Sequence, residues 1–387
     1  MQVNKVADTT TKSRSHTVAK RTDSMADGLV VAKSMNDQPH QDQLIQRTSL
    51  IDLATSKIGM YLDWDTNLFA LSIEELQYGV VALMVDMGFL AEFRIGRNTM
   101  INFLTVVASS YDANVPYHNF YHGFNVFQVC YIMLQDTHLD DYLERSDMLA
   151  LLIGAVCHDI GHKGVNNSFH KQMWKKDPKL TKLALIYNDA SVLENMHASR
   201  AFEITTEEGC NIFEKFQAND EKEVRRMMIK GILATDMEGH MEHVKAFKNH
   251  GDFDVANRAD RTFLIEISMH TSDLSNPTQP WENSKRWSLA VAQEFVDQVS
   301  LERKYGLPVS SHMDLQGEVS ELNPAIAKLN ISFTEYLVRG LVFAFADFFP
   351  GWQPRMAAME NNLKQWAILA EQEPPLAAAT KVDLEVL

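Results

Sequence analysis

The chain has few cysteines, and they form no recognisable pattern. Its 387 residues include only Cys130, Cys157 and Cys210, which lie far apart and make no CxxC pair. A sparse, odd set is typical of an intracellular protein with reduced thiols and argues against a disulfide-stabilised secreted domain. Cys157 precedes His158 and could be a metal ligand, but we favour a small buried hydrophobic residue at that position.

Positive charge is also scarce. Lys and Arg number 36 against 51 Asp and Glu, which gives a formal net charge of −15. A duplex nucleic-acid binder would normally present a basic face, so this balance argues against that class of protein. It does not exclude a small anionic substrate, because bound metal ions can invert the local field of an acidic protein.

Long apolar segments are missing as well. No unbroken apolar run is long enough to span a bilayer, and the N-terminus lacks the apolar core of a secretory signal. We therefore expect a cytoplasmic protein without a membrane span. Residues 1–45 are polar and lack a helical apolar period, so we expect them to be disordered. Residues 371–387 contain few core residues, and we expect a flexible tail there.

The part of the chain between these ends has the apolar spacing of helices. Apolar residues recur at helical intervals from about Ile51, period-2 segments are rare, and no repeat is found. This pattern predicts one all-α domain, residues 50–370, built as a compact bundle of many helices. Ser72 and Glu75 predict a capped helix start, and the apolar run 149–157 predicts a helix buried on all sides. Further helices are expected at 192–202, 223–234, 258–270, 287–305 and 332–349.

Histidines and aspartates recur at spacings that would bring them together. His118 and His122 are four residues apart, which predicts one face of a single helix for both. His158 and His162 repeat the spacing, and Asp159 lies beside the first of them. A further aspartate, Asp273, lies in the Ser-Asp-Leu-Ser-Asn-Pro segment at 272–277. His and Asp from separate helices are what a divalent metal site in a bundle core requires.

Each histidine alone has a simpler explanation. A lone histidine on an apolar helix is more often a hydrogen-bonded core residue than a ligand, and the chain has 14 of them. The joint pattern favours a metal site. Burying a carboxylate and several imidazoles without a metal would cost several kcal/mol in unpaired polar groups.

Several motifs give the sequence a specific resemblance. In order they are Tyr-His-Asn-x2-His at 117–122, His-Asp-x2-His at 158–162, Tyr-Asn-Asp-x-Ser-Val-Leu-Glu-Asn at 187–195, Ala-Thr-Asp-Met at 234–237 and the segment at 272–277. From about Trp64 to Trp366 the chain resembles the class I cyclic nucleotide phosphodiesterase catalytic domain. The resemblance implies a helical fold of the HD type and a two-metal site that hydrolyses cAMP or cGMP to the 5′-monophosphate, ending a cyclic nucleotide signal.

The resemblance assigns roles to individual residues. It implies that a tightly held zinc is bound by His122, His158, Asp159 and Asp273. Asp159 would also contact a second metal, magnesium or manganese. A water that bridges two such metals has its pKa lowered towards neutrality, and the resulting hydroxide attacks the phosphorus atom. His118 would be the general acid that protonates the leaving 3′-oxygen.

Other residues would act around the metals. The resemblance implies that His162, Glu194 and Thr235 position metal-bound waters. For Glu194, a plain surface charge is the alternative interpretation. The resemblance also suggests that Glu360 orients His118.

The base pocket is where the chain departs from the family. There, an aromatic residue stacks on the purine, and a glutamine three residues earlier hydrogen-bonds the base edge. Phe333 fits the aromatic position, which leaves Asn330 at the position of the glutamine. Asparagine has the same donor and acceptor but is one methylene shorter. It would require a shifted base, a bridging water or a different partner.

The resemblance implies four more residues of this pocket. Val291 would face Phe333 across the base, Tyr117 and Asn276 would line the pocket, and Trp287 would lie near the base. Without the resemblance, simple core packing would explain Phe333, Val291 and Trp287.

Three functions follow from these observations. The first is a cyclic nucleotide phosphodiesterase. The second is a metal-dependent phosphohydrolase for another nucleotide, which Asn330 motivates. The third is a nucleotide-binding scaffold with low activity, against which the intact metal and acid residues argue. The apolar helices could also form a homodimer surface.

Overall fold

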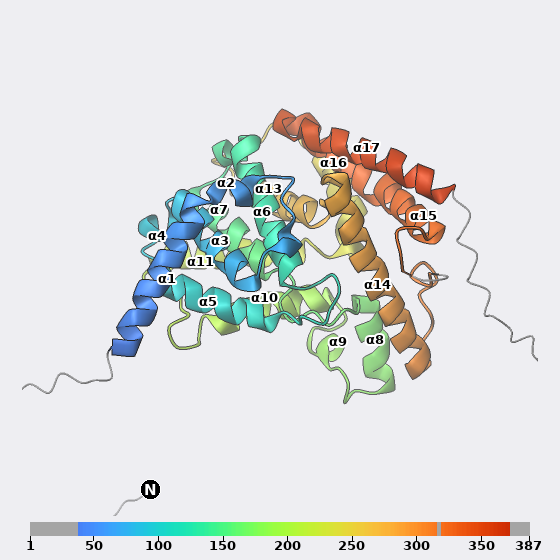
Figure 1. Cartoon of the computed structure of the whole chain (residues 1–387), viewed down its shortest axis with the longest axis horizontal. Helices are drawn as coiled ribbons and strands as arrows, with labels where there is room; N and C mark the ends of the chain where they lie inside the picture. The colour runs from blue at the N-terminus through green and yellow to red at the C-terminus, as the bar shows by residue number, and fades with distance from the viewer. Residues whose placement is uncertain (1–37, 316–318, 372–387) are drawn as a thin grey trace, which may run out of the picture. The chain divides into compact units, whose positions relative to one another are not determined.

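The computed structural model describes residues 38–315 and 319–371 (Figure 1). Over these residues the chain forms helices and no strand, which confirms the all-α prediction. The chain divides into two units, residues 1–43 and 44–387. Of the first unit, only the start of α1 (Gln38–Ser56) is described. The predicted disordered segment therefore lies largely outside the described residues, and its last part, from Gln38, is helical. The predicted tail also lies outside them from residue 372.

The helices alternate with short 3-10 turns. The first group comprises α1, α2 (Ile58–Leu62), α3 (Ile73–Asp86), α4 (Phe89–Glu92), α5 (Arg97–Ser110), α6 (Phe120–Asp136), α7 (Arg145–Cys157), α8 (Asn167–Lys176), α9 (Leu183–Ile186) and α10 (Val192–Ile204). The second comprises α11 (Ala218–Leu233), α12 (His240–Lys248), α13 (Arg258–Asp273), α14 (Trp281–Tyr305), α15 (Pro324–Phe333), α16 (Arg339–Phe348) and α17 (Gln353–Ala370).

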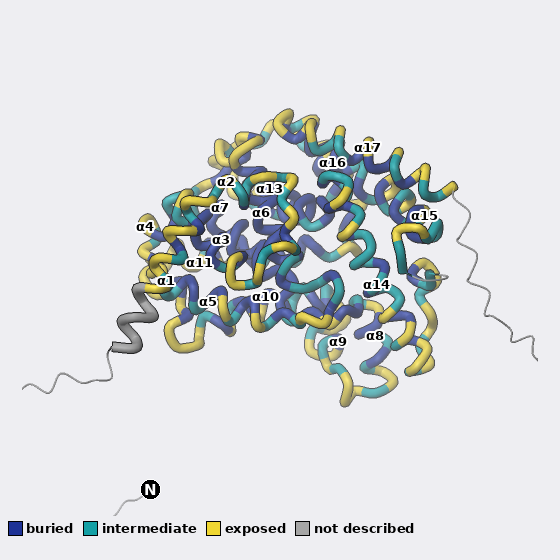
Figure 2. The backbone as a smooth tube through the Cα atoms, viewed as in Figure 1, coloured by how far each residue is buried: buried dark blue, intermediate teal, exposed yellow. Residues whose placement is uncertain are grey.

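Helix α7 forms the centre of the core. Every residue from Asp147 to Cys157 is buried, as the continuous apolar run predicted, and the helix packs against α6 and α11 (Figure 2). Burying a helix on all sides fixes its position within the bundle, because each face has a packing partner. The residues that follow the C-terminus of α7, beginning with His158, are therefore held in a fixed position.

Helix α6 is set beside α7 by a capped start and a close approach. The side chain of Asn119 caps the helix by accepting a hydrogen bond from the backbone N–H of Tyr121 at 3.0 Å. The hydroxyl of Tyr111 donates to the carbonyl oxygen of Val156 at 3.0 Å. A Cβ at Gly123 would lie 2.7 Å from that hydroxyl, so glycine is needed where α6 passes it. The start of α6 and the end of α7 are thus tied together.

The predicted helix at 332–349 is instead divided. Helix α15 ends at Phe333, a π-helical segment covers Thr334–Val338, and α16 continues from Arg339. By length and composition alone, Pro324–Phe348 could cross a membrane, although no such span was expected. Both α15 and α16 pack against α17 as core helices do, so the stretch is not a clear span.

The close packing of the 3-10 turn Pro350–Trp352 on the end of α6 gives the first testable prediction. A Cβ at Gly351 would lie 1.9 Å from the carbonyl oxygen of Asp136, a backbone atom that cannot swing away. We expect Gly351→Ala to lower the free energy of unfolding by about 3 kcal/mol, as in severe overpacking. Urea denaturation followed by circular dichroism measures the change. Gly59→Ala is the control, because nothing lies within 4 Å of its added Cβ. Equal stability of both variants would contradict the prediction.

Candidate active site

Four side chains from three helices converge on one point. His122 lies on α6, His158 and Asp159 follow the end of α7, and Asp273 is the last residue of α13. The Nε2 atom of His122 lies 2.9 Å from Oδ1 of Asp273 and 3.4 Å from Oδ2 of Asp159. The Nε2 atom of His158 lies 2.9 Å from Oδ2 of Asp159 and 3.4 Å from Oδ1 of Asp273. The two Nε2 atoms are 3.3 Å apart.

This arrangement fits a tetrahedral metal ion. Bonds of about 2.1 Å to four ligands place the ligand atoms about 3.4 Å from one another, close to the spacing of these four atoms. The Nδ1 atom of His158 donates to the carbonyl oxygen of Ala155 at 2.8 Å, which directs the Nε2 lone pair into the cluster. A hydrogen-bonded core would not aim two imidazole Nε2 atoms and two carboxylates at one point.

The charges of the cluster also suit a metal ion. Burial alone would raise the pKa of the Asp273 carboxyl, but the hydrogen bonds and charges of His122 and His158 hold that pKa below its usual range. Burial acts on the pKa of Asp159 in the same way, and the charges of His158 and His118 outweigh it. Both carboxylates are therefore ionised at neutral pH, as metal ligands must be.

The second oxygen of Asp159 faces a wider cavity. Its Oδ1 lies 3.6 Å from Nε2 of His197, and both residues line a cavity of about 830 Å³. The sequence-predicted residues His162, Glu194 and Thr235 line the same cavity. Asp159 thus has one oxygen in the four-residue cluster and the other directed towards the polar groups of this cavity.

His197 is a functional candidate that the sequence reasoning missed. Its Nδ1 donates to the carbonyl oxygen of Ile160 at 2.8 Å, so its Nε2 lone pair faces Asp159. Burial lowers the pKa of His197 to about 4, so the ring is neutral. A signal was present, because His197 lies three residues after Glu194 on what was predicted to be one helix.

Glu194 is more than a surface charge. The side-chain amide of Asn167 donates to both of its oxygens, at 3.1 and 3.0 Å. Burial, and then the charge of Asp236, raise the pKa of Glu194 to about 7. This carboxyl group can therefore exchange a proton near neutral pH, which suits a group that hydrogen-bonds water.

His118 lies beside the cluster, but not on the helix that was predicted. Helix α6 begins at Phe120 and Asn119 caps it, so His118 precedes the helix. The predicted shared face of His118 and His122 is therefore wrong, because the cap turns the chain. The ring of His118 instead stacks on His162, with ring centroids 4.0 Å apart. His118 still faces the cavity that Asp159 and His162 line.

Glu294 of α14 is the partner of His118. One carboxylate oxygen pairs with Nδ1 of His118, and the other accepts the backbone N–H groups of Tyr117 and His118, each at 3.1 Å. Burial would lower the pKa of His118, but the charges of Glu294 and Asp159 outweigh it and raise the pKa to about 9. His118 is consequently protonated at neutral pH, with Nδ1 facing Glu294 and Nε2 left for another partner.

The suggestion that Glu360 orients His118 is wrong. Glu360 pairs with Arg339, whose Nε lies 3.0 Å from its Oε1. The sequence held a signal for the correct residue. Trp287, Val291 and Glu294 fall at i, i+4 and i+7 of the predicted helix, so Glu294 shares their inward face.

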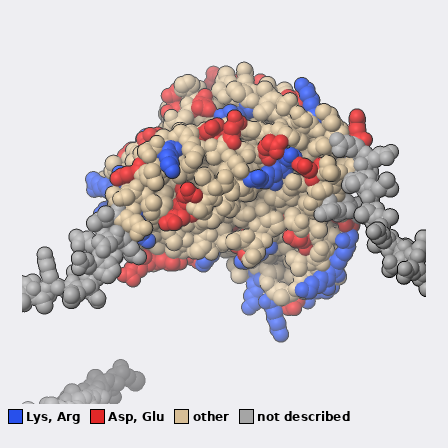
Figure 3. Space-filling view, viewed as in Figure 1, with Lys and Arg blue, Asp and Glu red and all other residues tan. Residues whose placement is uncertain are grey.

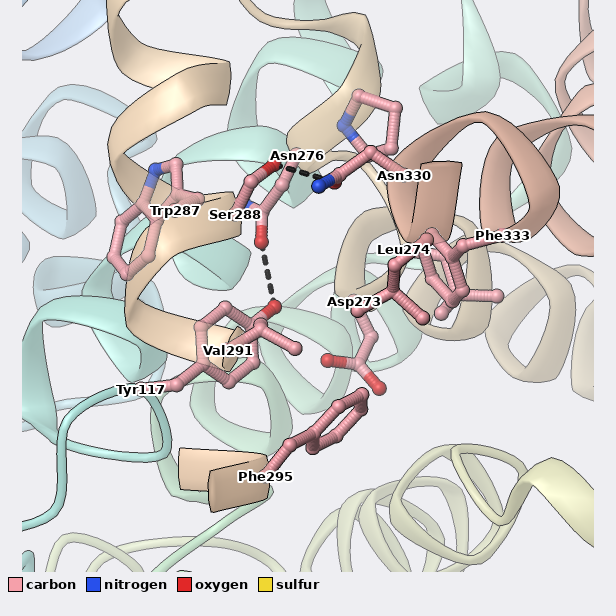
Figure 4. A pocket seen from close by; sticks show the side chains of 12 residues that line it. Tyr117, Asp273, Leu274, Asn276, Trp287, Ser288, Val291, Phe295, Asn330 and Phe333 are labelled. Atoms are coloured by element: carbon pink, nitrogen blue, oxygen red, sulfur yellow. Dashed lines mark hydrogen bonds between the residues drawn. The ribbon is translucent and has the colours of Figure 1, made fainter. Parts of the chain in front are cut away.

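A second cavity reaches the cluster at Asp273, which lines both cavities. It is lined by the predicted residues Tyr117, Asn276, Trp287, Val291, Asn330 and Phe333, and also by Asp273. Val291 of α14 and Phe333 of α15 lie on opposite sides of it (Figure 4). The Tyr117 hydroxyl donates to Oδ1 of Asn276 at 2.5 Å, and Nδ2 of Asn276 donates to Asn125 at 2.9 Å. This leaves the apolar walls and Asn330 to face a ligand.

Asn330 is held in one orientation. Its Nδ2 donates to the carbonyl oxygen of Ile326 at 2.8 Å, which directs Oδ1 towards Ser288. The Ser288 hydroxyl lies 2.6 Å from that oxygen and 2.9 Å from the carbonyl oxygen of Ser284 (Figure 4). The amide keeps one N–H and one lone pair for a ligand. The shorter side chain thus has partners within the protein, which sequence reasoning could not identify.

The chain is similar to known proteins. A family model described as 3′5′-cyclic nucleotide phosphodiesterase matches residues 117–359. The chain is 32% identical over 311 residues to the 3′,5′-cyclic-nucleotide phosphodiesterase regA of Dictyostelium discoideum, a match that covers 80% of this chain and 38% of that protein. The chain therefore spans well under half the length of this relative.

Solved structures are similar over the same part of the chain. The phosphodiesterase domain of the RhoPDE fusion protein from the choanoflagellate Salpingoeca rosetta matches with a TM-score of 0.75 and 32% identity, covering 80% of this chain and 96% of that one. LmjPDEB1 in complex with IBMX matches with a TM-score of 0.73 and 28% identity, covering 80% and 92%.

The cluster geometry predicts the effect of losing one ligand. Asp273→Ala removes one of the four converging ligand atoms, the carboxylate oxygen nearest to Nε2 of His122, so we expect the purified protein to retain less bound metal. Elemental analysis after gel filtration measures the bound metal. Asp252→Ala, an exposed position, is the control and should retain it. A fully loaded Asp273→Ala protein would exclude this residue as a ligand.

Proposed function

Because the chain belongs to the 3′5′-cyclic nucleotide phosphodiesterase family, we propose that it hydrolyses cAMP, cGMP or both to nucleoside 5′-monophosphates and so ends a cyclic nucleotide signal. The observation that carries the proposal is the convergence of His122, His158, Asp159 and Asp273 between two cavities. One cavity has the apolar walls that suit a purine. The other has the polar groups that suit water and phosphate.

The four converging residues would hold zinc, and Asp159 would share its other oxygen with magnesium or manganese. When bound, the metals supply a water that ionises near neutral pH and offset the charge of the phosphate. His162, Glu194 and Thr235, with His197, would hydrogen-bond the waters of that second site. Their placement along the cavity that Asp159 enters supports this role.

The chain itself supplies the proton for the leaving group. His118 holds it on Nε2, because Nδ1 is engaged by Glu294. Transfer of this proton to the 3′-oxygen lets the oxygen leave as an alcohol. The carboxylate of Glu294 is fixed by two backbone N–H groups, so the His118 ring has a set orientation before substrate arrives.

The apolar cavity would hold the base. Phe333 would stack on one face of the purine and Val291 would contact the other, while Asn330 would offer its remaining N–H and lone pair to the base edge. Tyr117, Asn276 and Trp287 would shape the walls. Trp287 is itself anchored, because its Nε1 donates to Gln279 at 3.2 Å.

A second candidate function has one observation in its favour. The side-chain amide of Asn330, which is held in one orientation, could suit a nucleotide other than cAMP or cGMP. The phosphodiester chemistry would be the same. A scaffold with low activity has less support, because the ligand atoms and His118 are all in position. We also propose a cytoplasmic location, which the three buried free cysteines support. A homodimer remains a prediction.

Hydrolysis of cAMP and cGMP, assayed side by side with added Mg²⁺ or Mn²⁺, tests the proposal. We expect turnover that a chelator abolishes and that added metal restores. No turnover of either nucleotide by metal-loaded protein would overturn it. A panel of other cyclic and linear nucleotides would then decide the second candidate.

The role of His118 predicts a separation of activity from metal binding. His118→Asn should lower turnover by about 10²–10⁴-fold, the usual contribution of a general acid. Its metal content should remain that of the unmodified protein, because His118 is not in the four-residue cluster. Unchanged turnover would exclude His118 as the acid.

Glu294 predicts a change in pH dependence. His118 titrates at about 9, so activity should decline as the pH rises towards that value, earlier once metal cations are bound. Glu294→Gln removes the strongest influence that raises this pKa, so the decline should begin at lower pH. Asp297→Asn, an exposed position on the same helix, is the control. An unshifted pH profile in Glu294→Gln would show that Glu294 does not set the pKa of His118.

The contact between Ser288 and Asn330 predicts an effect on base preference. With one orientation held, the amide should favour one purine, because adenine and guanine present opposite donors and acceptors. Ser288→Ala should bring the ratio of the kcat/KM values for cAMP and cGMP about tenfold closer to one. The change removes one hydrogen bond, which is worth about 1.4 kcal/mol. Ser300→Ala, which alters an exposed serine of the same helix, should leave the ratio unchanged. An unchanged ratio in Ser288→Ala would contradict the prediction.

A further inference from the structure

One segment of this acidic chain carries the opposite charge. Residues 163–186, which include α8 and α9, contain six lysines and a single acid, Asp177, while the whole chain has a formal charge of −15. Figure 3 shows blue side chains gathered on the lower lobe, where Figure 1 places α8 and α9. The charge is therefore distributed unevenly along the chain, and this segment is basic.

The lysines at the outer end of the segment have no acidic partner. Lys175, Lys176, Lys179 and Lys182 are exposed, and none of them makes an ion pair with another described residue. Among their ammonium groups, only that of Lys176 donates a hydrogen bond to a described residue, to the carbonyl oxygen of Gly306 at 3.0 Å. The two lysines nearer the catalytic cavity differ, because Lys163 pairs with Asp112 and Lys171 with Glu238.

Exposed aliphatic side chains lie among these lysines. Leu180, Leu185 and Ile186 are 53%, 55% and 59% exposed, and they fall within seven residues of one another. The segment does not need them for its own packing. Val165, Phe169 and Met173 already fix it against Leu301, Tyr305 and Leu307 at the end of α14. We call Lys175, Lys176, Lys179, Leu180, Lys182, Leu185 and Ile186 the α8–α9 surface.

We propose that the α8–α9 surface docks the protein on an anionic lipid bilayer. Unpaired lysines attract acidic headgroups, and aliphatic side chains between them can enter the boundary between headgroups and acyl chains. This combination favours a bilayer over a nucleic acid, which would leave the aliphatic side chains in water. The charge of the rest of the molecule is no obstacle, because salt screens charges beyond about 8 Å at physiological ionic strength.

Three acids lie in or near this segment, and two of them have other partners. Asp177 lies within the segment, where its Oδ1 accepts the backbone N–H of Lys179 at 3.0 Å. Glu238 is paired with Lys171, and Asp189 follows α9 on an exposed turn. None of the seven surface residues lines the cavities of the candidate active site. Changes to them should therefore leave hydrolysis in solution unaffected.

Vesicle co-sedimentation of the full chain tests the proposal. Vesicles of phosphatidylcholine with about 30% phosphatidylserine should bind the protein, and vesicles of phosphatidylcholine alone should bind it at least about tenfold less. Binding should be lost on going from about 0.1 M to 1 M salt, because the Debye length shortens from about 10 to 3 Å. Lys179→Glu with Lys182→Glu should weaken binding by at least about 25-fold, since each lysine contributes about fivefold.

Two further variants complete the test. Leu185→Ser with Ile186→Ser should also weaken vesicle binding, whereas Lys215→Glu with Lys222→Glu, exposed lysines outside the segment, should leave it unchanged. Unaltered thermal unfolding and hydrolysis would show that each variant is folded. Absence of binding to the acidic vesicles, or equal loss in the Lys215/Lys222 control, would overturn the proposal. Light scattering that shows the Leu185/Ile186 change breaking a dimer, with vesicle binding intact, would assign the surface to a second copy of the chain and overturn it too.

Discussion

Two imidazole nitrogens that lie 3.3 Å apart and 2.9–3.4 Å from the oxygens of two carboxylates set a demanding condition for the whole fold. Such a group is costly to bury unless a cation fills its centre. The helices that carry it must therefore be fixed by contacts that do not depend on the group itself. Burial of α7 on all sides and the Tyr111–Val156 hydrogen bond provide them. The rigid core of the bundle supports this cluster of two histidines and two aspartates, which is costly to bury.

The sequence allowed the fold class to be predicted, and it allowed the four residues that converge in the structure to be named, because both rest on local patterns. Apolar spacing marks helices, and an aspartate or histidine at a helix end remains recognisable in its motif. Failures came where a contact joins distant segments. Glu360 was proposed for His118, yet Glu294 holds it, 176 residues along the chain from its partner. No spacing rule relates those two positions, although the inward face of the predicted helix contained the clue.

Other differences arose from competition between local and long-range forces. The spacing of His118 and His122 suits one helix, but Asn119 is a strong N-cap, so the helix begins after His118. The run at 332–349 reads as one helix, yet a π-helical segment divides it next to Phe333. Asn330 was recognised as a departure from the family, but its partner Ser288 depends on how α14 and α15 pack. Packing decides such details, and a single sequence does not display it.

The positions of the site residues along the chain have a consequence for biosynthesis. All four converging residues lie in the stretch from His122 to Asp273, whereas Glu294, Asn330 and Phe333 come later. A ribosome makes the chain from its N-terminus, so these four residues leave the exit tunnel before the carboxylate that pairs with His118 and before some of the walls of the apolar cavity. These four side chains can therefore come together on the nascent chain before the walls of the apolar cavity have all been made.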